Sequence, residues 1–321
     1  MKVFFHRALA LMCIILLSPA VHASQELIPV GEVIGICLQD GSITVCEFDE
    51  ALGAQARSAG LQVGDVLLTI DREKVSSVQD VRSALERSNG TVELTVKRSG
   101  KEKKLTLSPN ITPDGPKLGV YLKQGITGIG TVTWYDPDSG IYGALGHGVN
   151  TQDGQLLTLK KGDVYRATVD GIKKGAAGEP GQLVGAVSDL TPVGQITKNT
   201  CQGIFGSIQT GWDTDAIPIA EKQQIKTGPA VIRSTVDDSQ VQEYSVEILK
   251  IYPNSDDTGR NMLLKVTDPA LLSTTGGIVQ GMSGSPIIQG GKLVGAVTHV
   301  LVNDPTTGYG IFIENMLDAA A

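Results

Sequence analysis

The sequence predicts a mainly β protein built from two folded units, and three observations support this class. The chain has 321 residues, of which 39 are glycine and only 4% are aromatic, a composition that suits short strands joined by turns. Short apolar segments bounded by glycines recur through most of the chain. At residues 109–117, PNITPDGPK, this pattern stops, so we expect a linker there between a smaller first unit and a larger second one.

The charge and the cysteines narrow the classes of function. A net charge of −7 argues against a nucleic-acid-binding protein, because no basic stretch could neutralise several phosphates. The four cysteines lack metal-ligand spacing, so we expect no metal and no cofactor; they are Cys13, Cys37, Cys46 and Cys201. Cys37 and Cys46 could face each other across a hairpin, but spacing alone does not decide whether they form a disulfide.

Residues 1–23 have the pattern of an export signal. Basic residues precede an apolar run from Ala8 to Leu17, and Val21-His22-Ala23 offers a small-residue cleavage site. The run is shorter than the roughly 20 apolar residues that span a bilayer comfortably. A cleaved signal peptide and an uncleaved membrane anchor are the two alternatives, and both place the remainder of the chain outside the cytoplasm.

The first unit, residues 33–108, reads as a small β-rich module with one helix. Ser77 is the expected N-cap of that helix, and Asn89-Gly90 is its expected end. The helix presents one apolar face, formed by Val78, Val81, Ala84 and Leu85. Strands are expected on both sides of it, at residues 43–48, 66–70, 92–97 and 103–107.

This unit resembles a PDZ domain, and the segment AGLQVGDVLLTID, residues 59–71, carries the resemblance. In such domains an apolar-Gly-apolar loop precedes a sheet edge, and a peptide C-terminus adds to that edge as a strand. Ile34-Gly35-Ile36 stands in the matching place and is the predicted peptide-binding loop. The alternative is an ordinary apolar turn into the first strand.

The second unit, residues 118–321, contains short apolar strands at regular spacing and almost no helical periodicity. This pattern, over about 200 residues, predicts two small barrels. Strands are expected at residues 119–122, 130–135, 141–145, 182–187, 203–208, 230–234 and 242–251.

Two histidines and one serine loop are the candidates for chemistry in this unit. His147 lies between two glycines at a strand end, where its imidazole would be accessible as a general base. His299 lies inside a β run and is the weaker candidate. In Gly281-Met282-Ser283-Gly284-Ser285-Pro286, Ser283 is the candidate nucleophile, and the amides of Gly281 and Ser283 could stabilise an oxyanion.

A tight turn between two strands is the alternative interpretation of that hexapeptide. Ser285 is the weaker serine, because Pro286 restricts its backbone to extended conformations.

The hexapeptide is similar to the Gly-x-Ser-Gly-x-Pro nucleophile loop of chymotrypsin-like serine peptidases. Together with ALGHGV (144–149) and GEPGQLVGAV (178–187), the segment TGGIVQGMSGSPI (275–287) looks like the SpoIVB peptidase family. The resemblance implies a PDZ domain followed by a chymotrypsin-like double β-barrel, with His147 as base and Ser283 as nucleophile. Asp268 matches the third, acidic member, although the residues alone do not favour it over Asp170, Asp189, Asp213 or Asp215. A turn aspartate before Pro269 is the other reading.

The resemblance also implies a biological role. Family members act in spore formation, in the space between forespore and mother cell. They cleave themselves and a membrane-bound regulator of an intramembrane protease, which activates a late sigma factor. Two other functions remain open at this stage: a non-catalytic PDZ adaptor that binds a membrane-protein tail, and a general quality-control protease.

Overall fold

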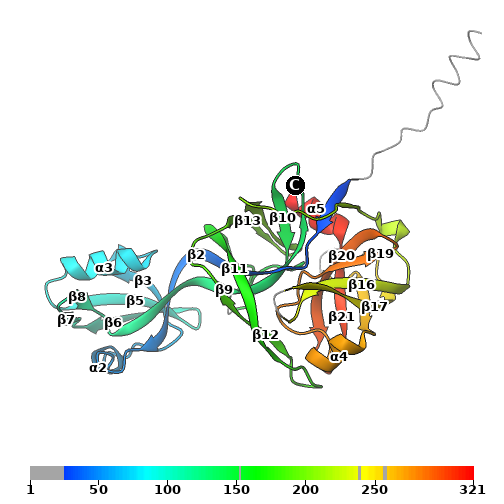
Figure 1. The fold of residues 1–321 in the computed structure, drawn as a ribbon. Coiled ribbons are helices and arrows are strands. Elements are labelled where there is room, and N and C mark those ends of the chain that lie inside the picture. The colour runs from blue at the N-terminus through cyan, green and yellow to red at the C-terminus, as the bar shows by residue number, and fades with distance from the viewer. Residues whose placement is uncertain (1–24, 152, 238–239, 256–258) are drawn as a thin grey trace, which may run out of the picture.

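The computed structural model describes residues 25–321, apart from residue 152, residues 238–239 and residues 256–258. The chain forms two β-barrels packed side by side, and a third unit projects from the first barrel (Figure 1). The mainly β fold class is confirmed. The predicted leader, residues 1–23, lies outside the described residues. In the part of the chain that the structure describes, no helix is long and apolar enough to cross a membrane.

The two barrels share one strand order. In each, the first three strands in sequence are followed around the barrel by the sixth, the fifth and the fourth. The first barrel consists of β2 (Val33–Phe48), β9 (Val120–Tyr135), β10 (Ile141–Ala144), β14 (Gly203–Ile208), β13 (Gly194–Thr200) and β11 (Lys161–Lys173). The second consists of β16 (Gly228–Thr235), β17 (Val241–Ile251), β18 (Met262–Val266), β21 (Asp304–Phe312), β20 (Lys292–Leu301) and β19 (Pro286–Gln289).

Short elements join and cover the barrels. The C-terminal helix α5 (Ile313–Ala320) packs in an apolar cluster that includes Trp134 and Phe205 of the first barrel and Ile311 of the second. Burial of these large side chains ties the two barrels together. The remaining elements are β1 (Glu26–Pro29), β12 (Gln182–Val187), β15 (Ile217–Pro218), the 3-10 helix η1 (Lys222–Gln224) and α4 (Pro269–Thr275).

The projecting unit is the predicted PDZ module, and its helix α3 (Val78–Arg87) forms as expected. Ser77 accepts a hydrogen bond from the Asp80 amide and completes a capping box. Val81, Ala84 and Leu85 are buried against the sheet, whereas Val78 is exposed. The other elements are α2 (Ala54–Ser58), β3 (Val66–Ile70), β4 (Glu73–Lys74), β5 (Val92–Arg98), β6 (Lys101–Leu107), β7 (Asn110–Thr112) and β8 (Gly115–Lys117).

The predicted domain boundaries need correction, because the PDZ unit is inserted into the first barrel. Residues 34–39 of β2 pair with β11 inside the barrel, whereas residues 43 and 44 of the same strand pair with β3 of the PDZ unit. β9 pairs with β2 along both parts. The predicted linker, residues 109–117, contains the β7–β8 hairpin. The sequence pattern did not predict the insertion, because polar residues and glycine interrupt both strands where they pass between the units. These residues are Gln39-Asp40-Gly41-Ser42 in β2 and Lys123-Gln124-Gly125 in β9, and they make each long strand look like two short ones.

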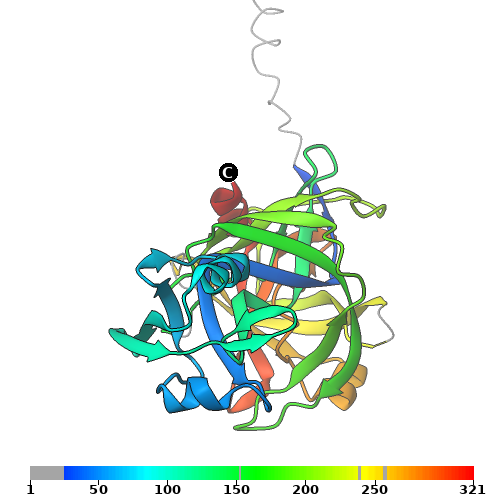
Figure 2. The same cartoon turned by 90° about the vertical axis from the view of Figure 1, so that its left-hand side faces the viewer.

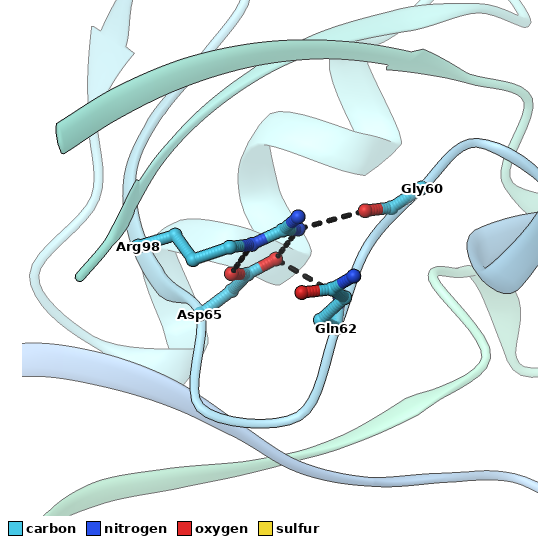
Figure 3. Close-up of polar contacts among 4 residues, drawn as sticks. All are labelled: Gly60, Gln62, Asp65 and Arg98. Atoms are coloured by element: carbon cyan, nitrogen blue, oxygen red, sulfur yellow. Dashed lines mark hydrogen bonds and ion pairs between the residues drawn. The ribbon is translucent and has the colours of Figure 1, made fainter.

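A buried ion pair holds the PDZ unit together. Asp65 is fully buried, and Arg98 donates to both of its carboxylate oxygens, from Nε and from a terminal nitrogen, at 2.6 Å each (Figure 3). Arg98 also donates to the Gly60 carbonyl, and the Gln62 amide donates to Asp65. The ion pair thereby fixes the Gly60–Asp65 loop against β5.

We expect Arg98→Gln to destabilise the PDZ unit by about 3 kcal/mol, because it leaves the Asp65 carboxylate buried without its partner. The matched control is Arg87→Gln, which removes an exposed pair with Glu73 and should cost less than about 1 kcal/mol. Native-state hydrogen exchange of amides in β3 and β5 measures the local opening free energy. Equal effects of the two substitutions would contradict the structural role of the buried pair.

Candidate active site

The turn after β10 presents His147 toward the second barrel. Leu145 and Gly146 both have φ of 69°, a region that is costly for leucine and is typical of functional sites. A Cβ on Gly146 would lie 2.9 Å from Thr298 Cγ2 of β20. Glycine at this position therefore permits the turn to pack directly against the other barrel.

The surroundings of His147 define its tautomer. Its Nδ1 lies 3.0 Å from the Gly148 carbonyl oxygen. Because a carbonyl oxygen only accepts, Nδ1 carries the hydrogen and Nε2 keeps a free lone pair. Burial lowers the pKa of His147, and the Gly148 hydrogen bond partly opposes this by raising it. At neutral pH the ring is therefore a neutral proton acceptor.

His299, the weaker candidate in the sequence, lies beside His147. The two ring centroids are 5.2 Å apart, with an interplanar angle of 38°. The pairing of β20 with β21 shifts between Val297 and His299, which places a β-bulge just before His299. Bulges often re-aim side chains near active sites. Partial burial, followed by the neighbouring His147 and Arg260, lowers the pKa of His299.

The hexapeptide at residues 281–286 forms a tight loop between the barrels. Gly281 and Gly284 both have φ of 99°, which favours glycine. Thr131 of β9 binds this loop twice: its amide donates to the Ser283 carbonyl at 3.1 Å, and its hydroxyl donates to the Gly281 carbonyl at 2.7 Å. The Thr131 carbonyl accepts from the Leu145 amide at 3.2 Å. One buried threonine therefore binds the loops of both Ser283 and His147.

The two serines of the loop differ in accessibility. Ser283 is half-buried, and its hydroxyl donates to the Thr298 carbonyl at 2.7 Å. Thr298 lies at the β-bulge, where its carbonyl is available to a side chain. Ser285 is fully buried and donates to the Ser234 hydroxyl, so only Ser283 is placed to meet a substrate.

The peptide planes that carry the Gly281 and Ser283 amides are fixed by the carbonyl groups of the residues before them. The Leu183 amide of β12 donates to the Gln280 carbonyl at 2.8 Å, and the Ser285 amide donates to the Met282 carbonyl at 3.0 Å. In a trans peptide the N–H points opposite to the C=O. Among the described residues, the amides of Gly281 and Ser283 donate no hydrogen bond, so both are available to an incoming oxyanion.

The structure does not bring Asp268 to His147, which corrects the role implied by the resemblance. Asp268 is the N-cap of α4: Oδ1 accepts from the amides of Ala270 and Leu271, and Oδ2 accepts from the Ser245 amide at 3.3 Å. Its charge acts on Tyr244, whose pKa is raised by burial and then by Asp268. Asp268 therefore caps a helix, in agreement with the alternative interpretation of a turn aspartate before Pro269.

The predicted peptide-binding loop, Ile34-Gly35-Ile36, is wrong. These residues lie in β2, where Gly35 pairs with Tyr165 of β11 on one side and with Ile129 of β9 on the other. Both edges of the strand are occupied, so its amides cannot hold a carboxylate. A second apolar-Gly-apolar sequence, Leu118-Gly119-Val120, leads into the edge of the PDZ sheet at β9. A strand order in which the edge strand of the PDZ sheet comes last in the sequence would have predicted this tripeptide as the loop.

The described residues contain no group of three or more His, Cys, Asp or Glu side chains that could hold a metal ion. Cys37, Cys46 and Cys201 are free thiols. No disulfide therefore joins Cys37 to Cys46, both of which lie in β2.

Two family profiles match the chain. The SpoIVB peptidase S55 family profile matches residues 115–317, and a PDZ domain profile matches residues 52–98. Among curated proteins, an Agrobacterium fabrum protein named as a zinc metalloprotease is 42% identical over 77 residues. This match covers 24% of the chain and 20% of the relative, so the chain spans about a fifth of that protein's length.

Two solved structures are similar to parts of the chain. The active form of the Rv3671c protease from M. tuberculosis is 14% identical, with 74% of this chain and 83% of that chain covered and a TM-score of 0.36. The PDZ domain of an SdrC-like protein from Listeria monocytogenes is 21% identical, with 25% and 85% covered and a TM-score of 0.22. The S55 profile spans more than half of the chain, and we conclude that the chain belongs to the SpoIVB peptidase S55 family of serine peptidases and carries a PDZ domain.

Proposed function

We propose that this serine peptidase cleaves polypeptides with Ser283 as nucleophile and His147 as general base. The observation that carries the proposal is the pair of loops held together by Thr131, one with the serine and one with the imidazole. The Ser283 hydroxyl turns from the Thr298 carbonyl toward Nε2 of His147, gives up its proton and attacks the substrate carbonyl. The amides of Gly281 and Ser283 stabilise the oxyanion.

The imidazolium formed in this step needs a partner, and two groups are in place. The Gly148 carbonyl accepts from Nδ1–H, and the neutral ring of His299 lies beside the ring of His147, where it can contact the cation. The imidazolium then protonates the leaving amine, and water hydrolyses the acyl-enzyme. In this proposal a backbone carbonyl orients the base, which is the task of a carboxylate in the Ser-His-Asp triad.

We also propose that the peptidase acts outside the cytoplasm in sporulation signalling. The family match and the export pattern of residues 1–23 support this role. Its substrates would be itself, cleaved after the leader, and a membrane-bound regulator of an intramembrane protease that controls a late sigma factor. The PDZ unit would take a peptide C-terminus at Leu118-Gly119-Val120.

Labelling with a fluorophosphonate tests the catalytic proposal. We expect the purified protein to be labelled, Ser283→Ala not at all, and His147→Ala at least about 10³-fold more slowly. Mass spectrometry of incubated samples should find fragments only in the protein that keeps Ser283. If the unmodified protein were neither labelled nor cleaved, the PDZ adaptor would become the better explanation.

Asp268→Ala separates helix capping from catalysis. We expect a loss of about 1 kcal/mol in the free energy of unfolding, since the N-cap of α4 is removed, and kcat/KM within about threefold of the unmodified enzyme. Ser245→Ala, which keeps the amide bonded to Asp268, is a control for the local surface. A folded Asp268→Ala protein with a loss near 10⁴-fold in kcat would restore Asp268 to the triad.

The pH profile of kcat/KM reports the ionisation of the free enzyme. Because burial lowers the pKa of His147, the base stays neutral to a lower pH than an exposed imidazole. We therefore expect the acid limb to have its midpoint below about pH 6.5, the ordinary imidazole value. A midpoint above that value would indicate a carboxylate partner that raises the pKa of His147.

A further inference from the structure

β9 joins the PDZ unit to the nucleophile loop, and one of its edges is open between them. Residues 120–131 of β9 pair with β2 along one edge. On the opposite edge, β10 pairs only at residues 132–135. Within the residues that the structure describes, no strand covers the opposite edge from residue 120 to residue 130. In Figure 1, β9 runs without a break from the PDZ unit into the barrels.

The polar groups of this edge are directed outward. At Thr131 the amide donates to Ser283 and the carbonyl accepts from Leu145, so both groups point away from β2. Strand geometry repeats every two residues, and the register with β2 is regular from Val33 to Leu38. The N–H and C=O groups of Ile129 and Thr127 therefore point the same way and can pair with an added strand.

An apolar groove lies beside this part of the edge. It has a volume of about 480 Å³, and its walls include Thr127 and Ile129 of β9 and Leu183 and Val187 of β12. Val184, Val187 and Leu190 are exposed there, at 51%, 40% and 87%. Leu183 also lies against Gly281: a Cβ added to Gly281 would be 3.0 Å from the Leu183 Cβ. The groove is therefore continuous with the catalytic loop.

The other end of the edge lies beside helix α3. The Gln124 side chain of β9 donates to the Ser76 carbonyl, just before the helix, and Val120 and Leu122 pack in the same apolar cluster as Val81 and Leu85. A carboxylate held at Leu118-Gly119-Val120, at the N-terminal end of β9, makes a bound peptide antiparallel to β9. The upstream residues of that peptide then extend toward Thr131 and Ser283.

We propose that one extended substrate segment with a free C-terminus occupies this edge from the PDZ unit to Ser283. This inference rests on the proposed function. The apolar groove takes side chains between the scissile bond and the C-terminus, and the PDZ unit holds the terminal carboxylate. Val120 and Thr131 are eleven positions apart, so an antiparallel strand in register places the cleaved bond about ten residues from the substrate's C-terminus.

A bend in β9 lets the number of residues between the cleaved bond and the C-terminus vary slightly. Gly125 has φ of 77°, and an added Cβ would lie 2.1 Å from the Leu38 carbonyl. The register with β2 shifts at the same place, between Leu38 and Ile43. A substrate strand that follows the bend can gain or lose about two residues there.

The test uses the full-length protein and a mixture of unstructured peptides, each longer than the β9 edge and synthesised both as the free acid and as the C-terminal amide. Mass spectrometry measures the length of the released C-terminal fragments, with Ser283→Ala as the blank. We expect lengths of about eight to twelve residues for the free acids. Amides, which lack the carboxylate, should be cleaved at least about tenfold more slowly and without a preferred length.

A pair of variants tests the edge itself. Thr127→Pro removes one outward N–H, a change that an edge strand tolerates, and Thr127→Val keeps it. We expect kcat/KM for the free acids to be at least about fivefold lower in the proline variant than in the valine variant.

Three outcomes are distinguishable. Clustered lengths that disappear on amidation support the proposal. Ser283 labelling together with equal cleavage of acids and amides overturns it and leaves the proposed function intact. Absence of both labelling and cleavage overturns the proposed function, and this proposal with it.

Discussion

The hydrogen bonds of Thr131 are the constraint on which the geometry of the proposed catalytic pair depends. Neither barrel contains both members of this pair: His147 follows β10 of the first barrel, and Ser283 precedes β19 of the second. Thr131 is fully buried, and its amide, hydroxyl and carbonyl bind both loops. An unpaired polar group at such a depth would cost about 1–3 kcal/mol. The two bonds to Ser283 and Gly281 therefore fix one barrel against the other, and the bond from Leu145 holds the His147 loop on the same strand.

The inserted PDZ unit is connected to the first barrel through the strand that contains Thr131, β9. A domain is tolerated inside another when its two ends lie close together, and here the ends are neighbouring strands of one ladder, β2 and β9. The connection is therefore a two-stranded ribbon with many backbone hydrogen bonds, and not a flexible linker. It resists twisting and sliding far better than a single chain would. In Figure 2, which is viewed from the side of the PDZ unit, that unit lies in front of the barrels.

Much of the fold and part of the site could be predicted from the sequence. The strands at 66–70, 182–187 and 203–208 were predicted to the residue, because glycines or turn residues bound short apolar runs there. The Ser77 cap was recognisable because capping is local. The contacts of Asp268 and His299, and the position of Ile34-Gly35-Ile36 inside a barrel, were not predictable, since each depends on which distant strands become neighbours. A β-bulge at Thr298 turns His299 toward His147, and nothing in the local pattern of residues 297–301 signals it.

The bond from Leu183 to Gln280 has a consequence for the timing of assembly. An amide of β12, which pairs with β11 of the first barrel, orients a peptide of the serine loop. The Gly284 amide of that loop donates to the Val297 carbonyl of β20. A polypeptide made from its N-terminus completes the first barrel and the PDZ unit while the serine loop still lacks β20 and β21. The serine loop therefore cannot reach its final conformation until β20 has been made, because Val297 and Thr298 of that strand accept hydrogen bonds from Gly284 and Ser283.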